Sequence, residues 1–237
     1  MHVRVAFLVF LMLLLPSLPV RSQQPAPAGP TGEDAEQVRL LQEGRRRIEA
    51  GRSAEAIKDC LDKVLAAFEE RYRDTRKQVF CARTESETLF YLLQSAKEKK
   101  EAVVIAPTWA DAWFMKGYAF LELGQVPAAK LALERAIALS PQNSQYLSEL
   151  GHCLHLEKDW NGALEVFRKA EEGASLASPD PVKIPERTRA LRGQGYSLVE
   201  LGKLEEAARK YQECLALNPD DATAKGELAY INSLLGH

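Results

Sequence analysis

The chain has 237 residues, of which 46% are hydrophobic and 27% charged, and its 31 Lys and Arg nearly balance 33 Asp and Glu for a net charge of −2. This composition excludes disordered, collagen-like and polytopic membrane proteins, and the charge balance argues against a general nucleic-acid-binding protein. The length allows one or two domains, each with a sizeable core.

The first 22 residues have the pattern of a secretory signal peptide. His2 and Arg4 precede an unbroken apolar run from Val5 to Leu15, and small residues follow as far as Ser22. The alternative is an uncleaved membrane anchor, but eleven helical residues reach only about 16 Å, against about 30 Å of hydrocarbon. We therefore expect cleavage after Ser22, export to the periplasm or the exterior, and no stable membrane insertion afterwards. The mature chain keeps 29 basic and 33 acidic residues, a net charge of −4, which again argues against nucleic-acid binding.

Residues 23–36 begin with a run rich in Pro, Ala and Gly, which predicts a flexible tether. From there to the end, the apolar residues recur with helical spacing, and no alternating strand-like run with hairpin punctuation is present.

The sequence repeats itself every 34 residues from residue 110 onward. The three clear copies are Ala110–Asn143, Ser144–Ala177 and Thr188–Asp221. Each has Gly in its eighth position and Ala in its twentieth, which lets two antiparallel helices approach closely, and large apolar residues in its fourth, eleventh and twenty-fourth. Pro in position 32 ends the second helix in the first and third copies. The small residues are Gly117, Ala129, Gly151, Ala163, Gly195 and Ala207.

This pattern resembles the tetratricopeptide repeat, a helix–turn–helix unit that stacks into a right-handed superhelix. The resemblance implies an all-α protein, an α-solenoid of such units. We divide it into two degenerate helix pairs (37–109), two repeats (110–177), a Pro-rich insert expected to form an extended loop (178–187), a further repeat (188–221) and a C-terminal capping helix (222–237). The stretch from Phe80 to Leu92 also resembles segments of exported bacterial proteins of this family.

Motifs that would indicate catalysis are missing from the sequence: there is no GxSxG elbow, Walker loop, HExxH or dinucleotide-binding fingerprint. We therefore expect no enzymatic activity and no cofactor. His152 and His155 share a helix face and could begin a metal site, but no further ligands are evident, so we assign no metal. Cys60 and Cys81 fall on consecutive predicted helices, where a disulfide and two free thiols are both open.

If the resemblance holds, the first helix of each repeat lines a concave groove through its positions 2, 5, 9, 12 and 13. Phe114 and Tyr118 would form an apolar end of this groove, and Arg189 and Arg192 a basic end, which suits an extended peptide with an apolar anchor and an acidic group. The residues that we assign to partner binding are Asp111, Phe114, Tyr118, Leu121, Glu122, Ser148, His152, His155, Arg189, Arg192 and Tyr196.

These observations favour a non-enzymatic adaptor of the cell envelope that recognises a protein or peptide segment in its groove. One alternative is a structural assembly factor of an envelope complex that is bound through its outer helix faces. Another, less favoured, is a metal-binding module that uses His152 and His155. The partner and the oligomeric state are not readable from the repeats, whose fixed positions report packing.

Overall fold

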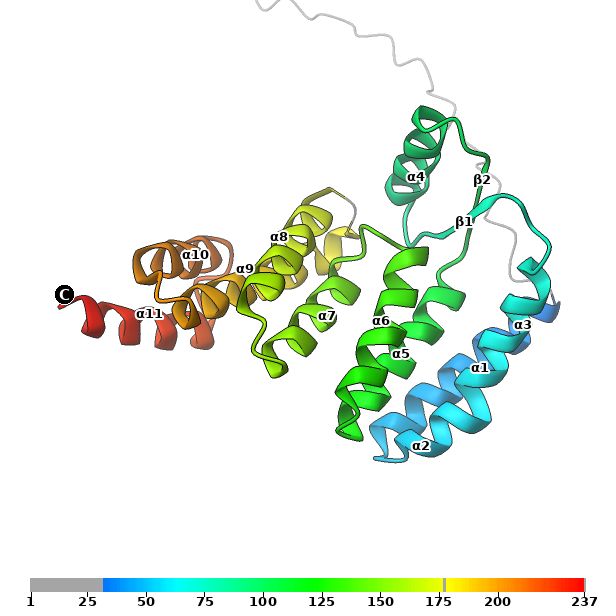
Figure 1. Cartoon of the computed structure of the whole chain (residues 1–237), viewed down its shortest axis with the longest axis horizontal. Coiled ribbons are helices and arrows are strands. Elements are labelled where there is room, and N and C mark those ends of the chain that lie inside the picture. The colour runs from blue at the N-terminus through cyan, green and yellow to red at the C-terminus, as the bar shows by residue number, and fades with distance from the viewer. Residues whose placement is uncertain (1–31, 177, 237) are drawn as a thin grey trace, which may run out of the picture.

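The computed structural model describes residues 32–176 and 178–236, which form a row of antiparallel helix pairs with one small β-α-β unit (Figure 1). The predicted signal peptide lies outside the described residues. The α-solenoid fold predicted from the repeat pattern is confirmed.

The three clear repeats form the middle and C-terminal part of the row, and a last helix covers its end. The final helix begins at Ala222, and Gly236 ends it with a left-handed backbone (φ 80°). The helices are α5 (Thr108–Glu122), α6 (Val126–Leu139), α7 (Ser144–Leu156), α8 (Trp160–Leu176), α9 (Asp180–Glu200), α10 (Leu204–Leu217) and α11 (Ala222–Leu235).

Close approach at glycine holds each of these pairs together, as the repeat pattern predicts. A Cβ added to Gly117 would lie 2.8 Å from the Leu133 side chain and 3.2 Å from the Ala129 carbonyl oxygen. Such distances are below van der Waals contact, so the helices can pack this tightly only without a side chain at that position.

The N-terminal helix pair extends further than predicted. Helix α1 spans Gly32–Glu49, so it includes residues 32–36 that we assigned to the tether. Acidic residues concentrate at the start of α1, where their negative charge interacts favourably with the helix dipole. One of them, Asp34, also accepts a hydrogen bond from Arg71 at 2.7 Å. Residues 23–31 lie outside the described part.

The partner of α1 is one continuous helical stretch with a wider turn inside it. Helix α2 (Ser53–Ala56) passes through the π-helical segment η1 (Ile57–Leu61) into α3 (Asp62–Tyr72). Within η1, Cys60 and Leu61 are buried against α1 at Gly44. Helices α1 and α3 both pack directly on α5.

The prediction of a second helix pair over residues 76–109 is wrong. The structure has β1 (Gln78–Cys81), α4 (Glu85–Lys97) and β2 (Ala102–Ile105) there, and the two strands pair in parallel from Gln78↔Ala102 to Cys81↔Ile105. Because α1 and α3 contact α5 directly, this β-α-β unit stands beside the row of helix pairs and does not occupy a place in it (Figure 1).

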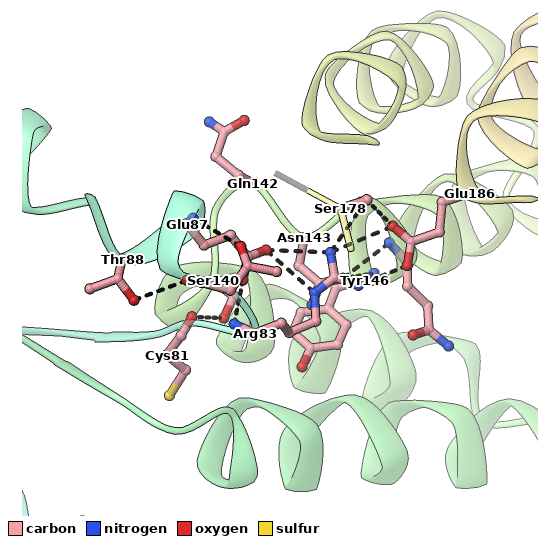
Figure 2. A network of polar contacts seen from close by, with 12 residues as sticks. Cys81, Arg83, Glu87, Thr88, Ser140, Gln142, Asn143, Tyr146, Ser178 and Glu186 are labelled. Atoms are coloured by element: carbon pink, nitrogen blue, oxygen red, sulfur yellow. Dashed lines mark hydrogen bonds and ion pairs between the residues drawn. The ribbon is translucent and has the colours of Figure 1, made fainter. Parts of the chain in front are cut away.

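Buried polar contacts fasten the β-α-β unit to the solenoid (Figure 2). Arg83 lies between two carboxylates: its guanidinium is 2.7 Å from Glu186 at the start of α9 and 3.3 Å from the fully buried Glu87 of α4. Burial raises the pKa of Glu87, although Arg83 opposes this shift. Ser140 adds a hydroxyl hydrogen bond of 2.5 Å to the Cys81 carbonyl.

The Pro-rich insert is also corrected, because α9 begins at Asp180 and takes up most of residues 178–187. Pro181 lies in the first turn, where a proline ring fits and no N–H bond is lost. Pro185 lies inside the helix, and its carbonyl accepts a hydrogen bond from the Thr188 hydroxyl at 3.1 Å. The residues expected to form a loop therefore lengthen the first helix of the repeat.

Candidate partner-binding groove

The first helices of successive pairs line two adjoining hollows on one side of the solenoid. The larger hollow has a volume of about 390 Å³, and α1, α5, α7 and α9 contribute to it. Its lining residues are Arg45, Ile48, Glu49, Asp111, Phe114, Met115, Tyr118, Gln145, Glu149 and Arg189.

The smaller hollow has a volume of about 220 Å³ and lies along α7 and α9 toward the C-terminal end. Arg189 lines both hollows, which therefore adjoin, and we call the two together the groove. The lining residues of the second hollow are Ser148, His152, His155, Phe167, Arg189, Arg192, Gly193, Tyr196, Tyr211, Thr223 and Glu227.

Nine of the eleven residues assigned to the groove from the sequence therefore lie together in these hollows, and Leu121 and Glu122 do not. Leu121 packs into the cluster of Ala129, Leu133 and Cys153. Glu122 accepts a hydrogen bond from the Ser53 hydroxyl. Both residues serve contacts between helices of the protein itself.

The contribution of α1 to the groove was not predicted from the sequence. Arg45, Ile48 and Glu49 occupy positions 9, 12 and 13 of the degenerate repeat that starts at Gln37, so the same positional rule applied there would have found them. Among the residues that the structure describes, Arg45 has no ion-pair partner, whereas Arg46 and Arg47 both pair with Glu43.

The predicted basic end of the groove is wrong in its electrostatics, because each arginine is paired with a carboxylate from a neighbouring element. Arg189 lies 2.6 Å from Glu149 of α7, and Arg192 pairs with Asp221 at the start of α11. Burial alone would raise the pKa of Asp221, but the Ala224 N–H and the Arg192 guanidinium outweigh it and lower that pKa. The C-terminal part of the groove is therefore close to neutral. Among the described residues that line the two hollows, the cation without an ion-pair partner is Arg45 of the larger hollow.

The apolar end of the groove is built on stacked rings. Phe114 stacks on the buried Tyr146 with ring centres 5.0 Å apart. The Tyr146 hydroxyl donates a hydrogen bond of 2.5 Å to the Asp111 carboxylate. Burial raises the pKa of Asp111 despite this bond, which opposes the shift. Asp111 is thus occupied by a neighbour in the fold, while Tyr118 remains 40% exposed and open to a ligand.

His155 belongs to an aromatic cluster in the second hollow. Its ring centre lies 5.0 Å from those of Phe167 and Tyr196 and 5.8 Å from that of Trp160. His155 Nε2 lies 2.8 Å from the Ser197 hydroxyl oxygen, which is also 2.9 Å from the Gly193 carbonyl oxygen. Burial, with a smaller contribution from His152, lowers the pKa of His155 to about 4, so the ring is neutral near pH 7.

Of the two alternatives left open for Cys60 and Cys81, the structure has two free thiols. Cys60 lies against Gly44 in the first helix pair, whereas Cys81 packs with Ala110, Ala136 and Tyr146. Burial raises the pKa of the Cys81 and Cys153 thiols to about 12, which keeps them protonated. Within the described ranges no group of three His, Cys, Asp or Glu side chains could hold a metal ion.

Comparisons with known proteins agree with this architecture. Two models of the tetratricopeptide repeat match residues 114–178 and 188–221, so these segments are tetratricopeptide repeats. Of the helices described in the structure, none is long and apolar enough to span a membrane.

Among curated proteins, the human Cell division cycle protein 16 homolog is 26% identical over 151 residues, which is 60% of this chain and 24% of that protein. The chain thus matches about a quarter of the length of this relative. Among solved structures, the fold is similar to PilF of Pseudomonas aeruginosa (TM-score 0.60, 19% identity, 86% of this chain and 71% of that chain). It is also similar to MamA (TM-score 0.55, 13% identity, 81% of this chain and 84% of that chain). At these identities the likeness shows the fold alone.

Proposed function

We propose that this protein is a non-enzymatic adaptor of the cell envelope, which holds a segment of a partner protein in the groove formed by α1, α5, α7 and α9. The tetratricopeptide fold supports a role in protein interaction, because stacked helix pairs create an extended concave surface for binding. The buried, protonated thiols are consistent with a role that involves no covalent step.

The observation that carries this proposal is the continuity of the two hollows. Arg189 lines both hollows, and beside buried core residues such as Ile48 and Tyr211 they present side chains that stay exposed. Tyr118 and Tyr196 occupy the same position in two repeats, and both are 40% exposed. Exposed aromatic rings on a rigid concave surface are suited to making most of the contact energy with a partner.

The lining indicates what kind of segment would fit. An apolar anchor can rest on Phe114, Met115 and Ile48 in the larger hollow. An acidic group of the same segment can reach the unpaired guanidinium of Arg45. The smaller hollow, where Arg192 is compensated and His155 is neutral, suits uncharged polar or aromatic side chains.

A capture experiment with matched variants tests the groove. The double substitution Tyr118→Ala and Tyr196→Ala removes both rings that are 40% exposed. Because Tyr196 also contacts His155 and Trp160, circular dichroism melting verifies that the variant remains folded. The control is Leu131→Ala on α6, a leucine that is 59% exposed and lines neither hollow. We expect partner capture from envelope extracts to be lost in the double variant and retained in the control. Capture that is unchanged in the double variant would contradict the groove model.

The same experiment distinguishes the groove model from the alternative of a structural assembly factor that is bound through its outer helix faces. The exposed Leu131 is the feature that favours this alternative. Loss of capture in Leu131→Ala, with capture retained in the double tyrosine variant, would establish it. The metal-binding alternative has no such support, because the Nε2 of His155 is used by Ser197 and the described residues supply no third ligand.

The envelope location rests on the signal peptide assigned to residues 1–22 and is tested independently of the groove. We expect protein expressed with its leader to be recovered from the periplasm or medium with Gln23 as its first residue. Intact-mass measurement distinguishes this product from the full chain. Recovery of the uncleaved chain from the cytoplasm would contradict export.

A further inference from the structure

Helix α4 presents a row of leucines to solvent. Leu89, Leu92 and Leu93 are 58%, 42% and 60% exposed, and Ala96 in the next turn is exposed as well. At about 100° per residue these four positions fall on one face of the helix. The opposite face carries the buried Tyr91, which stacks on Phe80 of β1 with ring centres 4.8 Å apart. The leucine face thus has no partner within the described part of the chain.

The position of α4 leaves this face accessible. The helix packs on β1 and β2 and stands apart from the row of helix pairs (Figure 1). None of its residues line the two hollows of the groove. A molecule bound to the leucine face would therefore leave the groove open.

The charges on α4 show which occupant fits. Glu85 in the first turn and Lys97 in the last turn are both exposed, and neither has an ion-pair partner among the residues described. A second α4 packed antiparallel places Glu85 of one copy opposite Lys97 of the other, and the helix dipoles then also oppose each other favourably.

Two uncharged pairs of α4 follow the same symmetry about Tyr91, the middle of the helix. Leu89 and Ser86 have exposed counterparts at Leu93 and Ala96, whereas the counterpart of Leu92 is the half-buried Phe90. In the antiparallel pair, Leu89 therefore meets Leu93 and Ser86 meets Ala96, each twice. The small side chains at these outer positions allow the helix axes to approach to about 8–10 Å. Three exposed pairs are thus matched in a second copy of the same helix, namely Glu85 with Lys97, Leu89 with Leu93 and Ser86 with Ala96.

We propose that the leucine face of α4 is a homodimer interface, with a twofold axis passing near the middle of the helix. Such an isologous contact is the commonest form of self-association. A helix of 13 residues is about 20 Å long, so the interface is small and we expect a weak dimer.

Analytical ultracentrifugation of the purified protein over a micromolar concentration series tests this proposal. Leu93→Glu would bury two carboxylates in the interface, and we expect it to raise the dimer dissociation constant by more than about 100-fold. Leu131→Glu is the matched control, because Leu131 is also a helical leucine and is 59% exposed. Circular dichroism melting verifies that both variants remain folded, as substitutions at exposed positions should.

A charge exchange makes the test independent of the leucines. Glu85→Lys and Lys97→Glu each place like charges opposite one another, and each should weaken the dimer by about tenfold. The double variant restores opposite charges and should regain the dissociation constant of the unchanged protein. A monomer at every concentration, equal weakening by Leu131→Glu, or no recovery in the double charge variant would each overturn the proposal.

Discussion

The eighth position of each repeat shows how a single residue controls the spacing of two helices. A Cβ added to Gly151 would lie 2.7 Å from the ring of Phe167, and one added to Gly195 would lie 2.7 Å from the ring of Tyr211. In both places the buried ring occupies the volume that a side chain would need. The recurrence of Gly every 34 residues therefore follows from the packing of large residues in the second helix.

Gly195→Ala should accordingly lower the free energy of unfolding by about 1–3 kcal/mol, because the Tyr211 ring has to move within a packed core. Gly226→Ala is the control, since Gly226 lies in α11 with no atom within 4 Å of the added Cβ. There alanine should raise stability by about 0.5–1 kcal/mol through its higher helix propensity. Urea unfolding measures both values, and equal effects at the two sites would contradict this account of the repeat.

The neutral imidazole of His155 predicts a loss of stability in acid. Its pKa is lowered from 6.5 to about 4 in the folded protein, so the unfolded chain binds a proton in this range and the folded chain does not. The free energy of unfolding is therefore not reduced by this group above pH 6.5, and it decreases as the pH falls toward about 4. Integrated over the window, the loss is about 3 kcal/mol.

His155→Phe keeps an aromatic ring in the cluster and removes the titrating group. As the pH falls through this window, the free energy of unfolding should decrease by about 3 kcal/mol more in the unchanged protein than in the variant. His152→Gln, an exposed neighbour in the same helix, should leave most of the acid loss in place. A pH-independent difference for His155→Phe would show that the imidazole is not held neutral.

At the scale of elements, the β-α-β unit is where prediction from the sequence failed. Its strands are only four residues each, QVFC and AVVI, and apolar runs this short do not distinguish a strand from one buried helical turn. Extending the 34-residue frame upstream therefore placed a helix pair there. The Pro-rich insert failed for a related reason, because Pro181 falls in the first turn of α9, where proline is compatible with a helix.

The Arg83 network gives this unit its attachment, and its removal should be costly. Arg83→Met leaves the carboxylates of Glu87 and Glu186 buried together without a cation, which should destabilise the protein by about 3–5 kcal/mol. Adding Glu87→Gln removes one of these charges and should recover part of the loss. Chemical unfolding of the single and double variants measures the coupling between Arg83 and Glu87. A double variant as unstable as Arg83→Met would contradict this role of the Arg83 network.

At the scale of the whole molecule, the repeat positions predicted which side chains would share one surface but not how their charges would be neutralised. Positions 5 and 9 place Phe114, Tyr118 and Tyr196 in the hollows. The partners of Arg189 and Arg192 could not be predicted, because Glu149 and Asp221 come from other elements, 40 and 29 residues away. The pair of Arg189 and Glu149 depends on how neighbouring repeats stack. The pair of Arg192 and Asp221, positions 5 and 34 of one repeat, depends on how the chain turns into α11. The repeat spacing specifies neither.

Site-specific photo-crosslinking tests the central claim, that the groove holds the partner, most directly. A photoreactive phenylalanine replaces Tyr118, Tyr196 or, as the control, Leu131 on α6. After irradiation in living cells, mass spectrometry identifies the crosslinked proteins. The groove model predicts one common partner attached at both tyrosine positions and absent at Leu131. Crosslinks to a partner at Leu131 with none at Tyr118 and Tyr196 would contradict it.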